Sequence, residues 1–556
     1  MNPEEKLWYK SWPKGVKKVI DIPNTTVHKL FEEYAKKNPD LVYLSLLGIE
    51  YTYAKVNDMA NQLANALIEL GVQKGDRIGL LMPNLHQFVI SFFGILKTGA
   101  TAVPLSPLYG PSDLEAVLRK VDLKGLIALD ILFEKVEETK IQIPLLIITA
   151  LGDILSPFLR FVAKLIGKLP KSPKIPGALS LYELIKTYEP IQQTVLVDSE
   201  DVAVLGSTGG TTGVPKNAML THRNLVANMV WLKEWPVMIH PPGMHKKYIG
   251  VVPFFHIIGL TGVMLSSIVL ESTVYLVPDP RRFEEILKLV SKEKINYFHG
   301  IPTLYKALLR HPKFKKYDLS SLEMVFSGAA PLPTSLAEEL ESNINGLVME
   351  AYGLTETSPI VSANPFEEDN RKIGSIGIPF IGTDVQIRNA ETDDIMPQGE
   401  IGEIVVKGPQ VMKGYYNDPD ATTQVIKNGW FYTGDLGYFD QDGFLFLVNR
   451  IKDMINVSGY KVYPREIEEI ISKDFPQILE AVVVASPDEY RGETVKMYAV
   501  LNQGETVTEK DIVSHLETKI APYKIPKKVE FVVSLPKTGI GKIDRKALRE
   551  REYMIH

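Results

Sequence analysis

The chain has 556 residues, of which 45% are hydrophobic and 23% are charged, and its net charge is −5 at neutral pH. This composition is typical of a globular protein and excludes a collagen-like or disordered chain, while the near balance of charge argues against nucleic acid as a partner. Because the chain contains no cysteine, it has no disulfide, thiolate metal site or cysteine nucleophile, so the sulfur of any thioester must come from a substrate.

No part of the sequence is predicted to cross a membrane. Residues 1–20 are polar and contain no apolar core of a secretory signal. The longest uncharged apolar stretch, Ile257–Leu270, is shorter than the roughly 20 residues that a spanning helix needs, so we predict a buried core helix there. The expected location is the cytoplasm.

The first part of the chain alternates predicted strands and helices. Tyr53–Leu70 is predicted to be a helix that ends at Gly71, and Arg77–Met82 a buried strand. Such alternation indicates an α/β fold with parallel sheets and helical crossovers. Further strands are predicted at Tyr248–Val252, Val274–Val277, Met324–Phe326 and Leu347–Glu350.

The pattern changes after Pro379, where short strands and polar turns predict a β-rich subdomain. Its strands are expected at Asp384–Arg388, Gly402–Lys407 and Phe444–Val448. After a polar link, we expect a helix at Arg465–Ser472, strands at Glu480–Ala485 and Lys496–Leu501, and a helix at Lys510–Ala521. We therefore predict a large N-terminal domain of stacked sheets with helices (1–448), a hinge (449–453) and a small α+β C-terminal domain (454–556).

Residues 154–182 form a basic segment without a single acidic residue. Apolar residues between Ile154 and Leu169 fall at helical spacing, and Arg160, Lys164 and Lys168 form a separate stripe. An amphipathic basic helix of this kind can lie in a membrane interface, or it can pack its apolar side on its own domain. The sequence leaves both interpretations open.

A glycine-rich loop, Gly206–Lys216, follows the apolar run Val202–Leu205 and is predicted to join this buried strand to a helix. Its four glycines let a ligand approach the backbone closely, and its amides, hydroxyl groups and lysine suit phosphate oxygens. The nucleotide P-loop pattern fails here, because Pro215 precedes Lys216 and Asn217 follows it. We therefore predict a phosphate-binding loop of a different kind.

Seven motifs, in this order, resemble those of the adenylate-forming superfamily, which comprises acyl-CoA synthetases, aryl-CoA ligases, luciferases and peptide-synthetase adenylation domains. They are STGGTTGVPK (Ser207–Lys216), PFFHIIG (Pro253–Gly259), SGAAPL (Ser327–Leu332), AYGLTETSP (Ala351–Pro359), YTGDLG (Tyr432–Gly437), RIKDMINVSGYKVYPREIE (Arg450–Glu468) and PKTGIGKIDR (Pro536–Arg545). The resemblance implies ATP-dependent activation of a carboxylate through an acyl-adenylate, with Mg²⁺ as cofactor and ATP and CoA as co-substrates.

The resemblance assigns the phosphate chemistry to two catalytic motifs. Glu356 is implied to be the Mg²⁺ ligand, with Thr355 beside it, and Mg²⁺ takes only one or two carboxylates when phosphate oxygens complete its shell. Lys542 is implied to bridge the substrate carboxylate and the α-phosphate, where its charge acts mainly in the transition state. The residues implied to contact the phosphates are Ser207, Thr208, Gly209, Thr211, Thr212 and Lys216.

The nucleoside is implied to lie between the next three motifs. Asp435 can accept hydrogen bonds from both ribose hydroxyl groups, with Arg450 assisting. Tyr352 is implied to stack on adenine, although a buried core tyrosine is an equal alternative. The backbone expected on the other face of adenine is that of Gly328, Ala329 and Ala330. Gly353, directly after Tyr352, is also implied to bind the nucleotide.

The C-terminal domain is implied to be mobile. Lys452 stands where the superfamily pivots this domain between two half-reactions, although Asn449 replaces the glycine that usually precedes the arginine. Rotation would withdraw Lys542 and present a loop to CoA, in which a glycine lets pantetheine pass close to the backbone. This loop comprises Ser458, Gly459 and Tyr460.

The acyl group is implied to lie beside Phe255, His256 and Gly300, with His256 as a positioning residue or gate, or as a core histidine. An apolar pocket wall, and the likeness of 154–182 to an insertion of bacterial long-chain fatty-acid CoA ligases, predict a fatty acid substrate and CoA as acceptor. Medium-chain or aryl acids and a separate carrier protein remain alternatives, as do an enzyme that transfers the γ-phosphate and a non-catalytic lipid-surface protein. The oligomeric state is left open, with a homodimer as one option.

Overall fold

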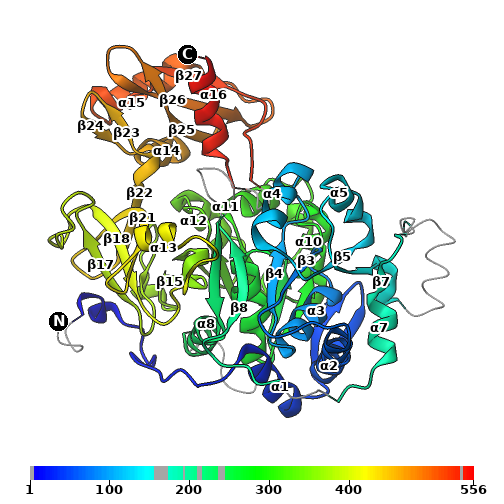
Figure 1. The fold of residues 1–556 in the computed structure, drawn as a ribbon. Helices are drawn as coiled ribbons and strands as arrows, with labels where there is room; N and C mark the ends of the chain where they lie inside the picture. Colours follow the sequence, from blue (N-terminus) through cyan, green and yellow to red (C-terminus); the bar gives the residue numbers. More distant parts are fainter. Residues whose placement is uncertain are drawn as a thin grey trace.

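The computed structural model describes residues 6–155, 173, 175–191, 195–208, 216–235, 244–538 and 542–555. A large domain carries three sheets, and a small C-terminal domain lies above it in Figure 1 and carries a fourth. The chain passes from one to the other at β22 and a short 3₁₀ turn, Ile451–Asp453.

An eight-stranded sheet forms one half of the large domain. Its inner strands are parallel, and the hairpin of β8 and β9 closes one side. In sheet order the strands are β19 (Gly414–Tyr415), β9 (Asn217–Thr221), β8 (Val202–Ser207), β4 (Thr101–Leu105), β3 (Arg77–Leu81), β5 (Gly125–Leu129), β6 (Leu145–Thr149) and β7 (Leu179–Ser180). Helices α4 (Pro111–Val121) and α5 (Phe133–Glu138) cover its outer face, and α7 (Leu181–Thr187) follows β7.

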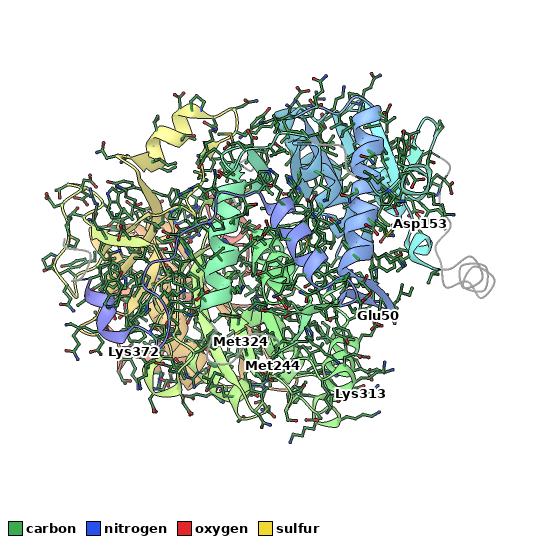
Figure 2. All side chains as sticks on the ribbon, turned by 90° about the horizontal axis from the view of Figure 1, so that it is seen from below. Glu50, Asp153, Met244, Lys313, Met324 and Lys372 are labelled. Atoms are coloured by element: carbon green, nitrogen blue, oxygen red, sulfur yellow. The ribbon has the colours of Figure 1, made fainter. Side chains whose placement is uncertain are left out.

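A nine-stranded sheet forms the other half. Its strands, in order, are β16 (Ile378–Pro379), β15 (Ile360–Ala363), β14 (Leu347–Gly353), β13 (Met324–Ser327), β12 (Tyr297–Gly300), β10 (Lys247–Gly250), β11 (Thr273–Leu276), β1 (Val42–Leu46) and β2 (Ile49–Thr52). Figure 2, seen from below, labels Met324 in β13 and Glu50 in edge strand β2, which lie well apart along this sheet. Its outer face is covered by α10 (Phe283–Glu293), α11 (Pro302–Leu309) and α12 (Thr334–Glu341).

One continuous hydrophobic core joins the inner faces of the two sheets. It contains side chains from both sheets and from the helices α1 (Val27–Lys37), α2 (Tyr53–Glu69), α3 (His86–Lys97), α8 (His222–Glu234) and α9 (Ser266–Val269). The large domain is therefore layered as helices, sheet, helices, sheet and helices, as an α/β chain with apolar faces on both sides of each sheet requires.

The β-rich subdomain follows the second sheet and lies beside it in Figure 1. It is antiparallel, and its strands are β17 (Asp384–Arg388), β18 (Gly402–Lys407), β20 (Ile426–Lys427), β21 (Trp430–Phe439) and β22 (Leu445–Arg450), with α13 (Pro419–Val425) before β20. Because β21 pairs with β22 so that Asp435 lies opposite Arg450, this sheet carries two predicted site residues to one edge.

The C-terminal domain has hydrophobic clusters of its own, which contain only residues from Ile455 onward. Its strands are β23 (Ile455–Val457), β24 (Tyr460–Val462), β25 (Ile478–Asp488), β26 (Gly492–Leu501) and β27 (Lys528–Phe531). Its helices are α14 (Pro464–Asp474), α15 (Glu509–Glu517) and α16 (Arg545–Ile555). Separate cores on either side of the 3₁₀ turn are compatible with the hinge predicted at 449–453.

Most predicted strands agree with the structure within a few residues, but three local predictions need correction. The glycine-rich loop joins two antiparallel strands, β8 and β9, and not a strand and a helix; α8 begins only after β9. The predicted core helix at Ile257–Leu270 is buried, but most of it is a π-helix, Ile258–Leu265, followed by α9. The helix predicted at Lys510–Ala521 ends at Glu517.

The basic segment 154–182 lies largely outside the described residues. At its start, Ile154 is the last residue of a 3₁₀ turn, Leu151–Ile154. At its end lie the short strand β7 and the first residues of α7, so a single helix does not continue to residue 182. Among the described residues, no helix combines the length and the apolar character that crossing a bilayer would require.

Candidate active site

The hairpin of β8 and β9 frames the phosphate loop. The Thr208 amide donates to the Lys216 carbonyl oxygen at 2.8 Å, and the Ser207 hydroxyl bonds to the Asn217 side-chain oxygen at 3.2 Å, so the base of the loop is closed. The predicted phosphate-contacting residues between these positions, Gly209, Thr211 and Thr212, lie outside the described residues.

Gly206 brings this hairpin against the Ala351–Pro359 motif. A Cβ atom at Gly206 would lie 2.7 Å from Cγ2 of Thr355, so only glycine lets the two motifs approach this closely. Gly353 has the same role within its motif, because a Cβ there would lie 1.9 Å from the Pro359 carbonyl oxygen. The close approach places Thr355 and Glu356 beside the phosphate loop.

Glu356 is held in a buried position by a segment that the sequence analysis did not assign to the site. Its carboxylate oxygen Oε1 accepts a hydrogen bond from the Tyr415 hydroxyl at 2.7 Å, and its carbonyl oxygen accepts one from the Met412 amide at 2.8 Å. Burial raises the pKa of the Glu356 carboxyl, and the bond from Tyr415 opposes that rise. The Lys216 ammonium lies 5.0 Å from the centre of the Tyr415 ring, so this tyrosine contacts both phosphate-side motifs.

Asp435 is the centre of a second cluster. Only 1% of its surface is exposed; its Oδ2 accepts a hydrogen bond from the Tyr352 hydroxyl at 2.6 Å, and its Oδ1 pairs with Arg450 Nε at 2.9 Å. Since a carboxylate has about four acceptor positions, ribose hydroxyl groups can still bind there. Tyr352 is therefore a buried tyrosine, and its hydroxyl group orients Asp435. The sequence did not indicate this contact with Asp435, and stacking of Tyr352 on adenine stays a prediction.

Lys542 reaches this cluster from the C-terminal domain. Burial and the nearby Arg450 charge lower the pKa of Lys542 to about 8, and the Asp435 carboxylate opposes the change. Burial, assisted by the Lys542 charge, lowers the pKa of His256 to about 3, so this imidazole is neutral at physiological pH. Side chains from distant motifs in both domains are therefore close enough for their charges to shift one another's pKa values.

The backbone of 328–330 closes the site on the sheet side. The Gly328 amide donates to the Gly300 carbonyl oxygen at 3.3 Å, and a Cβ at Gly328 would lie 3.6 Å from the Ala351 carbonyl oxygen. Ala329 has a positive φ of 68°, which a non-glycine residue adopts at some cost and which is frequent at functional sites. Ala330 follows in the same loop, so these residues lie next to the tyrosine motif. Their contact with adenine stays a prediction.

The predicted acyl-pocket residues have different surroundings. Phe255 and His256 are half-buried in the turn before the π-helix. Gly300 leaves room for the Tyr305 ring, since a Cβ there would lie 2.6 Å from the ring carbon Cζ. The structure therefore gives Gly300 a packing role, and its contact with an acyl group stays a prediction.

The CoA loop is not brought to the cluster in this domain orientation. Ser458 and Gly459 form the turn between β23 and β24 with positive φ angles of 51° and 90°, and Tyr460 stacks on Tyr523 within the C-terminal domain. Figure 1 shows β23 and β24 on the side of that domain away from α16. The Lys452 carbonyl oxygen accepts a hydrogen bond from Arg549 at 2.8 Å, so the predicted pivot contacts α16.

The donor set suits a cation that is bound mainly by its nucleotide. The described part of the chain contains no group of three or more acidic or histidine side chains able to hold a metal ion. Glu356 offers a single carboxylate whose orientation is held by Tyr415, beside a phosphate loop. This arrangement fits Mg²⁺, which usually keeps several waters and binds one or two carboxylates plus phosphate oxygens.

Comparisons with known proteins agree with these features. The AMP-binding enzyme family matches residues 31–416, and the AMP-binding enzyme C-terminal domain matches residues 466–542. The chain is 39% identical over 565 aligned residues to a long-chain-fatty-acid–CoA ligase of Bacillus subtilis, with 99% of both chains covered.

Two solved structures share the whole fold. An anthranilate CoA ligase, AuaEII, crystallised with anthranoyl-AMP, has a TM-score of 0.84 at 26% identity, covering 96% of this chain and 98% of its own. ATP-bound MatB from Rhodopseudomonas palustris has a TM-score of 0.82 at 27% identity, covering 96% and 100%. With the motifs, the fold and both family matches in agreement, this chain belongs to the AMP-binding enzymes, the adenylate-forming superfamily that its sequence resembles.

Proposed function

We propose that this enzyme activates a long-chain fatty acid with ATP through an acyl-adenylate and transfers the acyl group to CoA, releasing AMP and pyrophosphate. The observation that carries the proposal is that Lys542 of the C-terminal domain is close enough to the Asp435–Arg450 pair for their charges to act on it. The printed name of the Bacillus subtilis relative, a long-chain-fatty-acid–CoA ligase that matches nearly the full chain, supports the substrate and the acceptor.

In the first step, a carboxylate oxygen of the acid attacks the α-phosphorus, and the bond to the β-phosphate breaks with its electron pair on pyrophosphate. Two anions must approach each other, so the ammonium of Lys542 stabilises the transition state more than the separate reactants. Asp435 holds the ribose, and Arg450 keeps the Asp435 carboxylate in place. Glu356, together with phosphate oxygens of ATP, would hold Mg²⁺, and the bound ion would neutralise charge at the phosphates.

In the second step, the C-terminal domain turns about Lys452, so that Lys542 leaves and the Ser458–Tyr460 turn approaches the acyl-adenylate. The CoA sulfur then attacks the carbonyl carbon, and AMP leaves with the oxygen that joined it to the acyl group. Gly459 supports this role, because a Cβ at its position would meet nothing within 4 Å, which leaves the turn open to a ligand.

Apolar side chains around a small cavity of about 10 Å³ are compatible with a hydrocarbon substrate, although the cavity itself is too small to hold an acyl chain. It lies between α8 and the nine-stranded sheet and is lined by Leu232, Trp235, Tyr248, His299, Phe326 and Phe366. His299 and Phe326 immediately precede Gly300 and Ser327, where the loops of the site begin.

Two further properties belong to the proposal. The basic segment 154–182 contacts the membrane surface, where a fatty acid is concentrated and where a lysine-rich amphipathic helix is attracted by anionic lipids. The protein acts inside the cell as a peripheral membrane enzyme, since CoA and ATP are available there.

A panel of acids tests the proposal. The panel contains saturated acids of graded length, benzoate and an amino acid. Each acid is supplied with ATP, Mg²⁺ and CoA, and the amounts of AMP, ADP, pyrophosphate and thioester are measured. We expect AMP, pyrophosphate and acyl-CoA in equal amounts, with the highest kcat/KM for long chains. A preference for benzoate or short acids would contradict the fatty substrate, and ADP as product would contradict adenylation.

A further inference from the structure

Arg465 is a buried cation that connects the two domains. It lies in α14 of the C-terminal domain and only 7% of its surface is exposed. Its Nη1 donates to the Leu447 carbonyl oxygen in β22 at 2.5 Å, and its Nε donates to Glu469, one turn further along α14, at 2.7 Å. One side chain thus joins a helix beyond the predicted hinge to a strand before it.

Glu350, in the large domain, is close enough to Arg465 for the two charges to interact, although no hydrogen bond or ion pair joins them. It lies in β14, only 6% of its surface is exposed, and its Oε1 accepts a hydrogen bond from the Leu332 amide at 3.2 Å. Its Oε2 is buried and has no hydrogen-bond partner. Burial raises the pKa of Glu350 to about 7, Arg465 opposes the rise, and Glu469 adds to it.

The charges make the domain orientation depend on this pair. With α14 docked against α12, the Glu350 carboxylate is removed from water, and Arg465 supplies the compensating charge. Where Glu350 is ionised, loss of Arg465 would leave a buried charge without compensation, and because the pKa of Glu350 is already about 7, loss of Arg465 would also favour its protonation. Undocking the C-terminal domain would hydrate Glu350 again and relieve that cost.

We propose that Arg465 is a positioning residue for adenylation: together with Glu350 and the Leu447 carbonyl group, it latches the C-terminal domain in the orientation that brings Lys542 to Asp435. This inference rests on the proposed function. Among the described residues, a hydrogen bond from Lys306 to the Leu479 carbonyl oxygen and an ion pair between Lys461 and Glu391 cross the same boundary. Arg465 differs from both because it compensates a buried opposite charge across the boundary.

The two half-reactions separate this role from a general one. Acyl-adenylate formation without CoA, and thioester formation from supplied acyl-adenylate, are measured for Arg465→Ala, Glu350→Gln, the double variant, and Lys473→Ala as an exposed control on the same helix. Arg465→Ala should slow adenylation by about tenfold to a hundredfold and thioester formation by less than about threefold. Glu350→Gln in the Arg465→Ala background should restore at least about half of the lost rate on a logarithmic scale, because no buried charge is left.

Equal loss in both half-reactions, or no restoration in the double variant, would overturn the latch. Failure of the wild-type enzyme to form acyl-adenylate would instead overturn the proposed function. Arg465→Lys keeps the charge without the forked geometry, so it should fold and show the same division between half-reactions with a smaller loss.

The domain orientation can also be measured directly. Because the chain has no cysteine, Ile395→Cys and Val533→Cys, both at exposed positions, give one spin label in each domain. In Arg465→Lys and Arg465→Ala the docked distance should lose population, and Glu350→Gln should restore it in the Ala background. An unchanged distance distribution would overturn the proposal.

Discussion

Two buried carboxylates of this site have partners before any substrate binds. Asp435 accepts from Tyr352 and pairs with Arg450, and Glu356 accepts from Tyr415. Such bonds hold each carboxylate in one orientation, which lowers the cost of ordering it when nucleotide arrives. Lys542 is the exception. Burial and the nearby Arg450 charge disfavour its ammonium form, and the Asp435 carboxylate only partly offsets them.

Lys542→Ala tests the role of that cation. Removing the ammonium should lower the rate of acyl-adenylate formation by about a hundredfold or more, because the loss occurs only in the transition state. Transfer to CoA from supplied acyl-adenylate should change by less than about threefold, since Lys542 is withdrawn in that step. Equal losses in single-turnover measurements of both steps would contradict the proposed exchange of domain positions.

The pH dependence of adenylation follows from the lowered pKa of Lys542, about 8 in the substrate-free enzyme. The ammonium is the active form, so kcat/KM for adenylation should be level below pH 8 and should fall as pH rises through it. Without substrates, the docked lysine loses its proton near pH 8, whereas the undocked or unfolded lysine keeps it up to the ordinary pKa of 10.5. Between pH 8 and 10.5 the undocked state therefore binds more protons, so docking becomes more favourable as the pH rises through this range. A rate of adenylation that stays constant to pH 9.5 would contradict this assignment.

Tyr415→Phe removes one hydrogen bond and leaves the ring next to Lys216. Because this bond orients Glu356, the concentration of the Mg²⁺–ATP or Mn²⁺–ATP complex that gives half-maximal binding should rise by about tenfold. Binding is followed by Mn²⁺ resonance in the presence of ATP as well as by rate. Tyr416→Phe, one residue further on, is the matched control, and an equal effect of both variants would remove the special role of Tyr415.

At the level of elements, strands and their order could largely be predicted from apolar runs and motif positions. The contacts that complete the site could not, because they join segments far apart in the sequence. Tyr415 reaches Glu356 because β19 pairs with β9, next to Lys216, and no local pattern marks that pairing. The π-helix after His256 was equally hidden, since apolar content predicts a buried helix without specifying its hydrogen-bond register.

The hairpin that frames the phosphate loop shows how a local prediction can fail. The hydrophobic run before the loop indicated a strand, and the residues after it, Asn217–Thr221, contain too few alternating positions to reveal a second one. What marks the site is Gly206, whose missing side chain admits Thr355. That requirement depends on a neighbour more than a hundred residues away, so only the fold explains it.

The basic segment can be tested as one element. Arg160→Glu, Lys164→Glu and Lys168→Glu together should lower partitioning onto anionic vesicles by at least about a hundredfold, because losing each basic residue near the surface costs about 1 kcal/mol and the new carboxylates are repelled. Lys14→Glu, Lys17→Glu and Lys18→Glu change the net charge by the same amount at exposed positions and serve as the control. If both triple variants bind vesicles equally, the segment is a surface helix of its own domain.

On the scale of the whole molecule, the hydrophobic cores of the described residues divide the chain into two bodies joined near Lys452, and the predicted site draws residues from both. The large domain supplies the phosphate loop, Glu356, Asp435 and Arg450, and the small domain supplies Lys542. The motifs predicted residues of the site, whereas the hydrogen bond from Arg465 to the Leu447 carbonyl oxygen, near the charge of Glu350, depends on how the two surfaces fit.

The most direct test follows oxygen atoms. A long-chain acid labelled with ¹⁸O in both carboxylate oxygens is incubated with the enzyme, ATP, Mg²⁺ and CoA, and the phosphorus-containing products are analysed by mass spectrometry. Attack of the carboxylate on the α-phosphorus, followed by thioester formation, leaves one labelled oxygen in AMP and none in pyrophosphate. Label in inorganic phosphate, or unlabelled AMP beside newly formed thioester, would contradict an acyl-adenylate on the path.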